Sequence, residues 1–151
     1  MKFLCDQMLG TLAKWLRIYG LDTFFANSET DDKELLKIAK AENRTLVTRD
    51  RELTYSAKRE NLTVIELKTK DLDEQIKAVL NYVKIDKSKI LSRCIICNSV
   101  VDEIKKDDVK NKVPEKVFEI NEDFWYCKKC DKIYWKGTHY EKMIEKTMEL
   151  K

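Results

Sequence analysis

The sequence lacks a hydrophobic run long enough to cross a membrane, because its longest apolar runs, such as Phe24–Ala26, span only a few residues. A membrane-spanning helix needs about 20 consecutive apolar residues. The sequence also contains no internal repeat, no low-complexity tract and no segment typical of a signal peptide. We therefore expect a cytoplasmic protein without membrane attachment.

The sequence also lacks a strong excess of charge of one sign. Thirty basic and 27 acidic residues give a net charge of +3, which does not by itself indicate binding to nucleic acid. A basic binding surface would have to arise from the local arrangement of side chains. Hydrophobic residues make up 43% of the 151 residues. That is enough for one ordinary domain, or for a domain of about 90 residues joined to a small metal-bound one.

Residues 1–83 alternate between segments typical of strands and segments typical of helices. Strands are expected at 2–6, 23–26, 45–48 and 63–67. Helices are expected at 8–19, from 31 or 32 to about 43, in a short stretch ending at 59, and from 71 to 83. This alternation predicts an α/β fold in which a parallel sheet has helices on both faces.

The character of the sequence changes after residue 83. Residues 84–92 contain three lysines and resemble a linker, and residues 93–151 then form a second predicted domain. Between its cysteine pairs we expect polar, strand-like segments rather than helices. A C-terminal helix is indicated by apolar residues on one helical face, namely Tyr140, Met143, Ile144, Thr147 and Met148.

Four of the five cysteines form two Cys-x-x-Cys pairs, separated by 29 residues. Each pair is expected on a tight turn, and four thiolates complete the tetrahedral shell of a structural Zn²⁺ without an open position. A redox disulfide is the alternative, but it would need only one pair. Cys5 is most simply a buried strand residue. We therefore predict one structural zinc per chain, with the ligands Cys94, Cys97, Cys127 and Cys130.

Acidic residues fall at the ends of three predicted strands. Asp6 ends the first strand, Asp31 and Asp32 lie between the second strand and its helix, and Asp50 follows the third strand. In open α/β sheets, ligands bind at the carboxyl ends of the strands. Converging carboxylates repel one another unless a cation neutralises them, and Mg²⁺ or Mn²⁺ suits such oxygen ligands. The alternative is that Asp31 or Asp32 caps a helix and that Asp50 is a turn residue.

Basic and aromatic residues lie near both predicted sites. Lys14 and Arg17 are one helical turn apart, and Arg49 and Arg51 flank Asp50. Near the second cysteine pair, aromatic rings alternate with lysines, an arrangement in which bases can stack while lysines contact phosphates. The basic residues could equally pair with nearby acids, and the aromatic rings could form the core of the ribbon. The candidate RNA-binding residues are Lys14, Arg17, Arg49, Arg51, Lys128, Lys136 and His139, the single histidine.

Several of these segments resemble the Mut-seven C-terminal RNase domain family. The opening FLCDQMLG at 3–10 is similar to the start of that family, as are LAKWLR at 12–17 and Gly20. LVTRDR at 46–51 resembles its central signature. RCIICN at 93–98, YCKKC at 126–130 and YWKGTHY at 134–140 resemble its zinc ribbon. The resemblance extends over nearly the whole chain.

The resemblance implies a PIN-like nuclease fold over residues 1–83, a linker at 84–92, and a zinc ribbon with a C-terminal helix over 93–151. It also implies catalytic metal ligands at Asp6, at Asp31 or Asp32, and at Asp50. PIN nucleases usually present about four acids. Glu52 and Glu66 are the candidates for the fourth, and both are also consistent with surface residues.

Three functions follow from these observations. The first is a metal-dependent endoribonuclease, a hydrolase of RNA phosphodiesters. The second is a non-catalytic RNA-binding or ribosome-associated protein that uses the ribbon, with ribosomal or transfer RNA as its partner. A protein-interaction module of a toxin–antitoxin pair is a third reading, but it leaves the ribbon without a purpose.

Overall fold

The computed structural model describes residues 1–137, 142, 144 and 145. Its N-terminal part contains a four-stranded sheet in the order β2-β1-β3-β4. Every neighbouring pair of strands is parallel, and Cys5 at the end of β1 pairs with Phe25 on one side and Val47 on the other. The strands are β1 (Phe3–Cys5), β2 (Thr23–Phe25), β3 (Thr45–Thr48) and β4 (Val64–Glu66).

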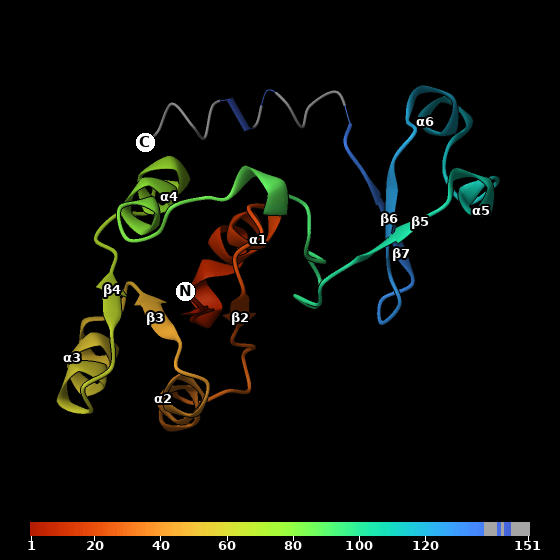
Figure 1. The fold of residues 1–151 in the computed structure, drawn as a ribbon. Helices are drawn as coiled ribbons and strands as arrows, with labels where there is room; N and C mark the ends of the chain where they lie inside the picture. The colour runs from red at the N-terminus through yellow and green to blue at the C-terminus, as the bar shows by residue number, and fades with distance from the viewer. Residues whose placement is uncertain (138–141, 143, 146–151) are drawn as a thin grey trace.

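Helices cover both faces of this sheet (Figure 1). One face packs against α1 (Gly10–Ile18) and α4 (Leu72–Leu80), and the other packs against α2 (Asp32–Ala41) and α3 (Arg51–Arg59). Alternate residues of a strand point to opposite faces, so Phe3 and Cys5 join the first core and Leu4 joins the second. The predicted α/β fold with a parallel sheet flanked by helices is confirmed.

Aspartates cap the start of three of the helices. The side chains of Asp31, Asp50 and Asp71 accept hydrogen bonds from backbone N–H groups in the first turns of α2, α3 and α4. Such caps satisfy donors that have no partner inside the helix. A short 3-10 helix, η1 (Gln7–Leu9), precedes α1 and is capped by Asp6.

Residues 84–92, which were expected to be a linker, pack against the N-terminal part of the chain. Ile85 and Ile90 are buried in the core shared with α1 and α4, and the backbone N–H of Leu91 donates to the carbonyl of Ile18 at 2.8 Å. This segment includes the 3-10 helix η2 (Lys87–Lys89). The lysines that suggested a linker are exposed, while the isoleucines between them face inward.

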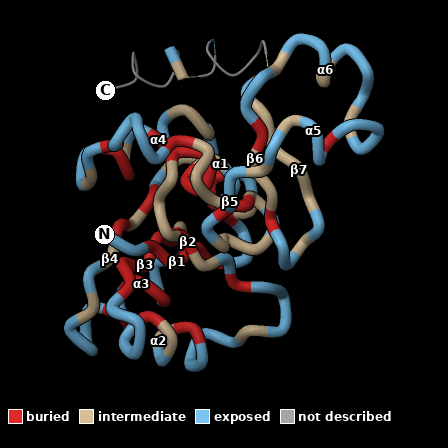
Figure 2. The backbone as a smooth tube through the Cα atoms, turned by 45° about the vertical axis from the view of Figure 1, so that its right-hand side comes forward, coloured by how far each residue is buried: buried red, intermediate tan, exposed pale blue. Residues whose placement is uncertain are grey.

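The C-terminal part contains an antiparallel three-stranded sheet of β5 (Asp102–Ile104), β6 (Phe124–Cys127) and β7 (Lys132–Trp135). Between the cysteine pairs, the strand-like prediction is wrong for two short helices, α5 (Lys106–Val109) and α6 (Glu115–Ile120). They have four and six residues, too few for helical periodicity to be recognised. Figure 2 shows that the residues around α5 and α6 are mostly exposed, whereas buried residues gather around β1, β3 and α1.

Most of the predicted C-terminal helix lies outside the described residues, and so does His139. Lys142, Ile144 and Glu145 are helical, and Ile144 packs against the core between α1 and α4. Within the described part of the chain, no helix combines the length and apolarity needed to cross a membrane.

A substitution at Gly20 can test how residues 84–92 pack against this position. Its φ is +83°, and a Cβ at this position would clash with the carbonyl oxygen of Lys89. We predict that Gly20→Ala lowers the free energy of unfolding by more than about 1–2 kcal/mol, the cost of the left-handed conformation alone. Urea denaturation measures the change.

Gly137→Ala is the matched control, because its nearest neighbour would be Trp135 Nε1 at 3.8 Å. Equal stabilities of the two variants would contradict the described packing at Gly20.

Candidate functional site

An acidic cavity of about 290 Å³ lies at the carboxyl ends of the parallel strands. It lies beside β1 and β3, whose following helices cover opposite faces of the sheet. Ligands of open α/β sheets bind at such switch points. Three carboxylates line the cavity, together with one arginine and several apolar groups. The lining residues are Asp6, Gln7, Met8, Ala26, Thr30, Asp32, Leu35, Arg49, Asp50 and Leu53.

Thr48 connects two of the acidic segments. Its side-chain hydroxyl donates to Asp6 Oδ2 and accepts a hydrogen bond from the backbone N–H of Asp50 at 3.0 Å. Thr48 is fully buried, so these bonds are shielded from water. This role of Thr48 is not among the sequence-based predictions. The available signal was a hydroxyl at the last position of a buried strand, where it needs a polar partner.

The structure separates Asp31 from Asp32. Asp31 accepts a hydrogen bond from the backbone N–H of Glu34 at 2.8 Å and is absent from the lining of the cavity, whereas Asp32 lines it. Burial raises the pKa of Asp32, and the charges of Asp50 and Asp6 raise it further. Nearby negative charges disfavour the ionised form, so the three carboxylates of the cavity act on one another.

Asp50, which the sequence left open as a cation ligand or a turn residue, caps helix α3. Its Oδ1 accepts hydrogen bonds from the N–H groups of Glu52 and Leu53 at 2.9 and 3.2 Å. The described hydrogen bonds of its side chain all use this oxygen, so none of them involves Oδ2, and the residue is exposed. A helix cap and a cation ligand are therefore compatible in this residue.

Neither candidate for a fourth acid lines the cavity. Glu52 is exposed and contributes to the raised pKa of Asp32 only at a distance, while Glu66 is half-buried at the end of β4. Arg49 is the basic residue of the lining, whereas Arg51 and Lys14 are exposed outside it.

The four predicted cysteines converge in the C-terminal part. Their sulfur atoms all lie within 4.8 Å of one another, and Cys97 Sγ lies 3.6 Å from Cys127 Sγ. A tetrahedron with Zn–S distances of about 2.3 Å has S–S edges of about 3.8 Å, whereas a disulfide needs about 2.05 Å. All four are free thiols. This geometry supports a structural zinc.

The thiols of this cluster ionise unequally. Burial raises the pKa of Cys97, but hydrogen bonds with Ser99 and Cys127 outweigh it and lower the pKa to about 6. A hydrogen bond with Cys97 and burial raise the pKa of Cys130 to about 12. Ionisation of one thiol therefore disfavours ionisation of its neighbours. A bound divalent cation would stabilise all four thiolates together.

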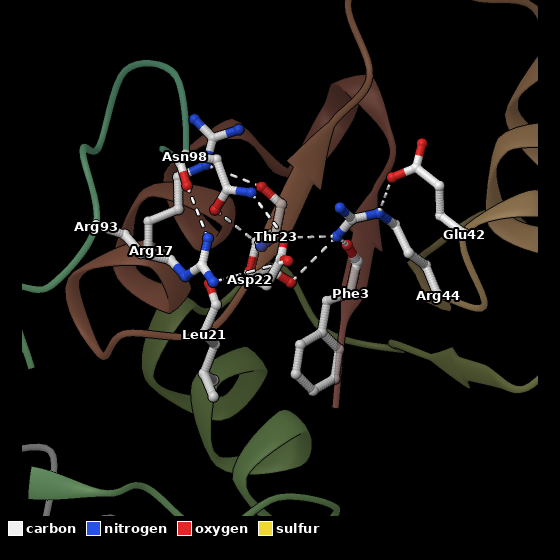
Figure 3. Close-up of polar contacts among 9 residues, drawn as sticks. All are labelled: Phe3, Arg17, Leu21, Asp22, Thr23, Glu42, Arg44, Arg93 and Asn98. Carbon is white, nitrogen blue, oxygen red and sulfur yellow. Dashed lines mark hydrogen bonds and ion pairs between the residues drawn. The ribbon is translucent and has the colours of Figure 1, made fainter. Parts of the chain in front are cut away.

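Arg17 lies with Thr23 and Asn98 where the N-terminal and C-terminal parts of the chain meet (Figure 3). It is absent from the lining of the acidic cavity. Its Nε donates to the carbonyl of Thr23 at 2.9 Å, and its Nη1 donates to the carbonyls of Ile95 and Ile96 at 3.0 and 3.1 Å. The guanidinium is buried, so the structure does not support the expected contact between Arg17 and RNA.

Asp22, Asn98 and Arg93 also contribute to this junction, with Arg93 donating to the carbonyl of Asn98 at 2.9 Å. Asn98 accepts a hydrogen bond from the backbone N–H of Thr23 at 3.0 Å and donates to Asp22 Oδ1 at 2.7 Å. Asp22 also pairs with Arg44 at 2.8 Å (Figure 3). Burial alone would raise the pKa of Asp22, but its bonds with Asn98 and Arg44 lower it.

The aromatic residues of the ribbon divide between two roles. Trp125 and Tyr134 pack against the cysteine cluster, which confirms that part of the aromatic group is core. Lys136 lies 5.5 Å from the centre of the Trp125 ring, and exposed Lys128 lies 3.8 Å from Asp102. Both lysines remain at the surface.

A family model described as the Mut7-C RNAse domain matches residues 1–147. The chain belongs to this family. Comparisons with curated proteins and with solved structures gave no match. The match spans the acidic cavity and the cysteine cluster of this Mut7-C chain, and it indicates a nuclease-like function with RNA as substrate or partner.

The cysteine cluster leads to a prediction about metal content. The purified Mut7-C chain should contain one zinc per molecule, measured by elemental analysis. Cys127→Ser should release the zinc and unfold the ribbon, because structural zinc supplies much of the folding free energy of such small units. The α/β domain should remain folded, which amide NMR spectra would show.

Cys5→Ser is the matched control, because Cys5 is buried in β1 away from the cluster. It should retain one zinc. A zinc-free wild type, or a native Cys94–Cys97 disulfide, would contradict the prediction.

Proposed function

We propose that this chain is a metal-dependent, PIN-like endoribonuclease that acts in the cytoplasm. The cation would be Mg²⁺ or Mn²⁺, with Asp6, Asp32 and Asp50 as its ligands. The observation that carries the proposal is the convergence of three carboxylates in one cavity at the switch point of the sheet. Membership of an RNase domain family supports RNA as the substrate.

The residues of the cavity suit a hard divalent cation. All three ligands would be carboxylate oxygens, which Mg²⁺ and Mn²⁺ prefer. Asp50 Oδ2 has no described hydrogen bond. Burial, and then the charges of Asp50 and Asp6, raise the pKa of Asp32, and a nearby cation would lower it. Thr48 holds Asp6 in place through one oxygen. When bound, the cation would polarise the phosphodiester and lower the pKa of a water nucleophile.

Other residues of the cavity suit the substrate. Arg49 lines the cavity beside the carboxylates, and a guanidinium binds phosphate oxygens in a planar, bidentate manner. Helices η1, α2 and α3 begin at this edge of the sheet. The N-terminus of a helix favours negative charge, so α2 and α3 would help to hold a phosphate next to the acids.

A second function is supported by a different observation. Three acids line the cavity where PIN nucleases usually present about four. Lys128 and Lys136 are exposed on the ribbon, and Lys136 lies over the Trp125 ring. These features are consistent with a non-catalytic RNA-binding or ribosome-associated protein, with ribosomal or transfer RNA as its partner. In that case the ribbon, and not the cavity, would supply most of the affinity.

Substitution of Asp6 and of Asp32 tests catalysis, with the neighbouring Asp31 as the control. Wild type should cleave single-stranded or loop RNA only with Mg²⁺ or Mn²⁺, and Asp6→Asn should abolish cleavage. We predict that Asp32→Asn lowers the rate by more than about 100-fold, because loss of even an outer-shell metal partner costs 10–100-fold. Rates are measured on a fluorescently labelled RNA.

Asp31→Asn is the matched control and should retain activity, because Asn caps helices as well as Asp does. Equal effects at Asp31 and Asp32 would contradict the proposed ligand set. Tight, salt-sensitive RNA binding by a wild type that never cleaves would favour the non-catalytic alternative.

A further inference from the structure

Two arginines of the α/β domain are equally buried, each with 8% of its surface exposed, but they have different partners. Arg44 forms ion pairs with Asp22 and Glu42. The described hydrogen bonds of Arg17 instead go to main-chain carbonyls, two of which belong to Ile95 and Ile96 in the Cys94–Cys97 turn. A buried charge is costly unless opposite charge lies nearby. Carbonyl dipoles alone offset the charge of Arg17 incompletely.

The cysteine cluster can supply the missing negative charge. Four thiolates around one Zn²⁺ have a net charge of about −2. The Arg17 guanidinium donates to the carbonyls of Ile95 and Ile96 at 3.0 and 3.1 Å. These two residues lie between Cys94 and Cys97 in the sequence. At such separations and in a buried environment, opposite charges attract strongly.

The orientation of the turn strengthens this link. The carbonyls of Ile95 and Ile96 face Arg17, and each belongs to a peptide unit whose N–H is carried by the next residue. In a trans peptide the N–H points away from its own carbonyl, so the N–H groups of Ile96 and Cys97 point away from Arg17. Burial raises the pKa of the Cys94 thiol, and both N–H groups lower it. Both peptide dipoles therefore lie between the guanidinium and the sulfur atom. A donor at the carbonyl end polarises the peptide and improves its N–H as a donor.

Tyr134, a residue of β7, also contacts Cys94. Its hydroxyl lies 3.0 Å from Cys94 Sγ and accepts a hydrogen bond from the N–H of Ile95 at 3.2 Å. The hydroxyl proton is then directed at the sulfur. Such outer partners orient metal ligands and adjust the affinity of the site. The ribbon supplies Tyr134, whereas the other domain supplies Arg17.

We propose that Arg17 is a positioning residue of the zinc centre, supplied by the α/β domain. It holds the Cys94–Cys97 turn in its ligating conformation and offsets the negative charge of the four thiolates. Zinc affinity therefore depends on the docking of the two domains. By linkage, zinc binding stabilises the contact between the turn and β2 to the same extent.

The first experiment compares zinc affinity in full-length variants by competition with a chelator. Arg17→Met should weaken zinc binding by about 10–100-fold, the usual effect of losing an outer-shell partner. Arg17→Lys keeps the charge but not the planar set of donors, so its loss should be smaller. Arg44→Met is the matched control. It removes an equally buried arginine that reaches the turn only indirectly, through Asp22 and Asn98, so its loss of zinc affinity should be clearly smaller than that of Arg17→Met.

A spectroscopic measurement separates this role from a general loss of stability. In Co²⁺-substituted protein, Arg17→Met should shift the thiolate-to-cobalt charge-transfer band to lower energy, since sulfur atoms with weaker N–H donors hold their electrons less tightly. The Arg44→Met band should not move. An unchanged affinity and band in Arg17→Met would overturn the proposal, as would equal losses in Arg17→Met and Arg44→Met.

Hydrogen exchange provides a further test that needs only the wild-type protein, with and without zinc. The N–H of Thr23 donates to Asn98, next to the turn, whereas the N–H of Thr45 donates to Lys2 within the α/β domain. Removal of zinc should accelerate exchange at Thr23 by more than about tenfold and leave Thr45 protected. Protection of Thr23 that is unchanged without zinc would contradict the coupling.

Discussion

The common direction of β1, β2 and β3 is the constraint on which the candidate site depends. Because these strands are parallel, the segments that leave them all begin at one edge of the sheet, and each places an aspartate there. The Thr48 hydroxyl then links Asp6 to the backbone of Asp50. Burial raises the pKa of Asp32, and repulsion from Asp50 and Asp6 raises it further. A fold that gathers carboxylates at this edge is stabilised by a cation that neutralises them.

The ribbon is joined to this sheet through its metal-binding turn. Arg17, Asp22 and Asn98 connect β2 and α1 to the backbone around Cys94 and Cys97. Residues 84–92 contribute Ile85 and Ile90 to the core of the α/β domain. The N-terminal and C-terminal parts of the chain therefore contact each other through these residues, and we expect the cysteine cluster and the sheet to stabilise each other.

The sequence was sufficient to predict features that depend on local pattern. Strand 45–48 and the four cysteines were predicted correctly, because β-branched runs and paired Cys-x-x-Cys elements carry their own signal. The choice between Asp31 and Asp32 was not predictable, since it depends on which of two adjacent side chains turns toward the cavity. Arg17 looked like a surface residue because its carbonyl partners lie 78 and 79 residues away. Such long-range contacts leave no trace in local sequence.

The most direct test of the central claim is a titration of zinc-loaded, ¹⁵N-labelled protein with Mn²⁺, followed by paramagnetic broadening of amide signals. The account predicts saturable broadening at one site, strongest for Gln7, Asp32 and Arg49, and its loss in Asp6→Asn. Broadening that is scattered over exposed acids elsewhere, such as Glu115 and Glu119 of α6, or that does not saturate, would contradict a shared cation site at the ends of β1, β2 and β3.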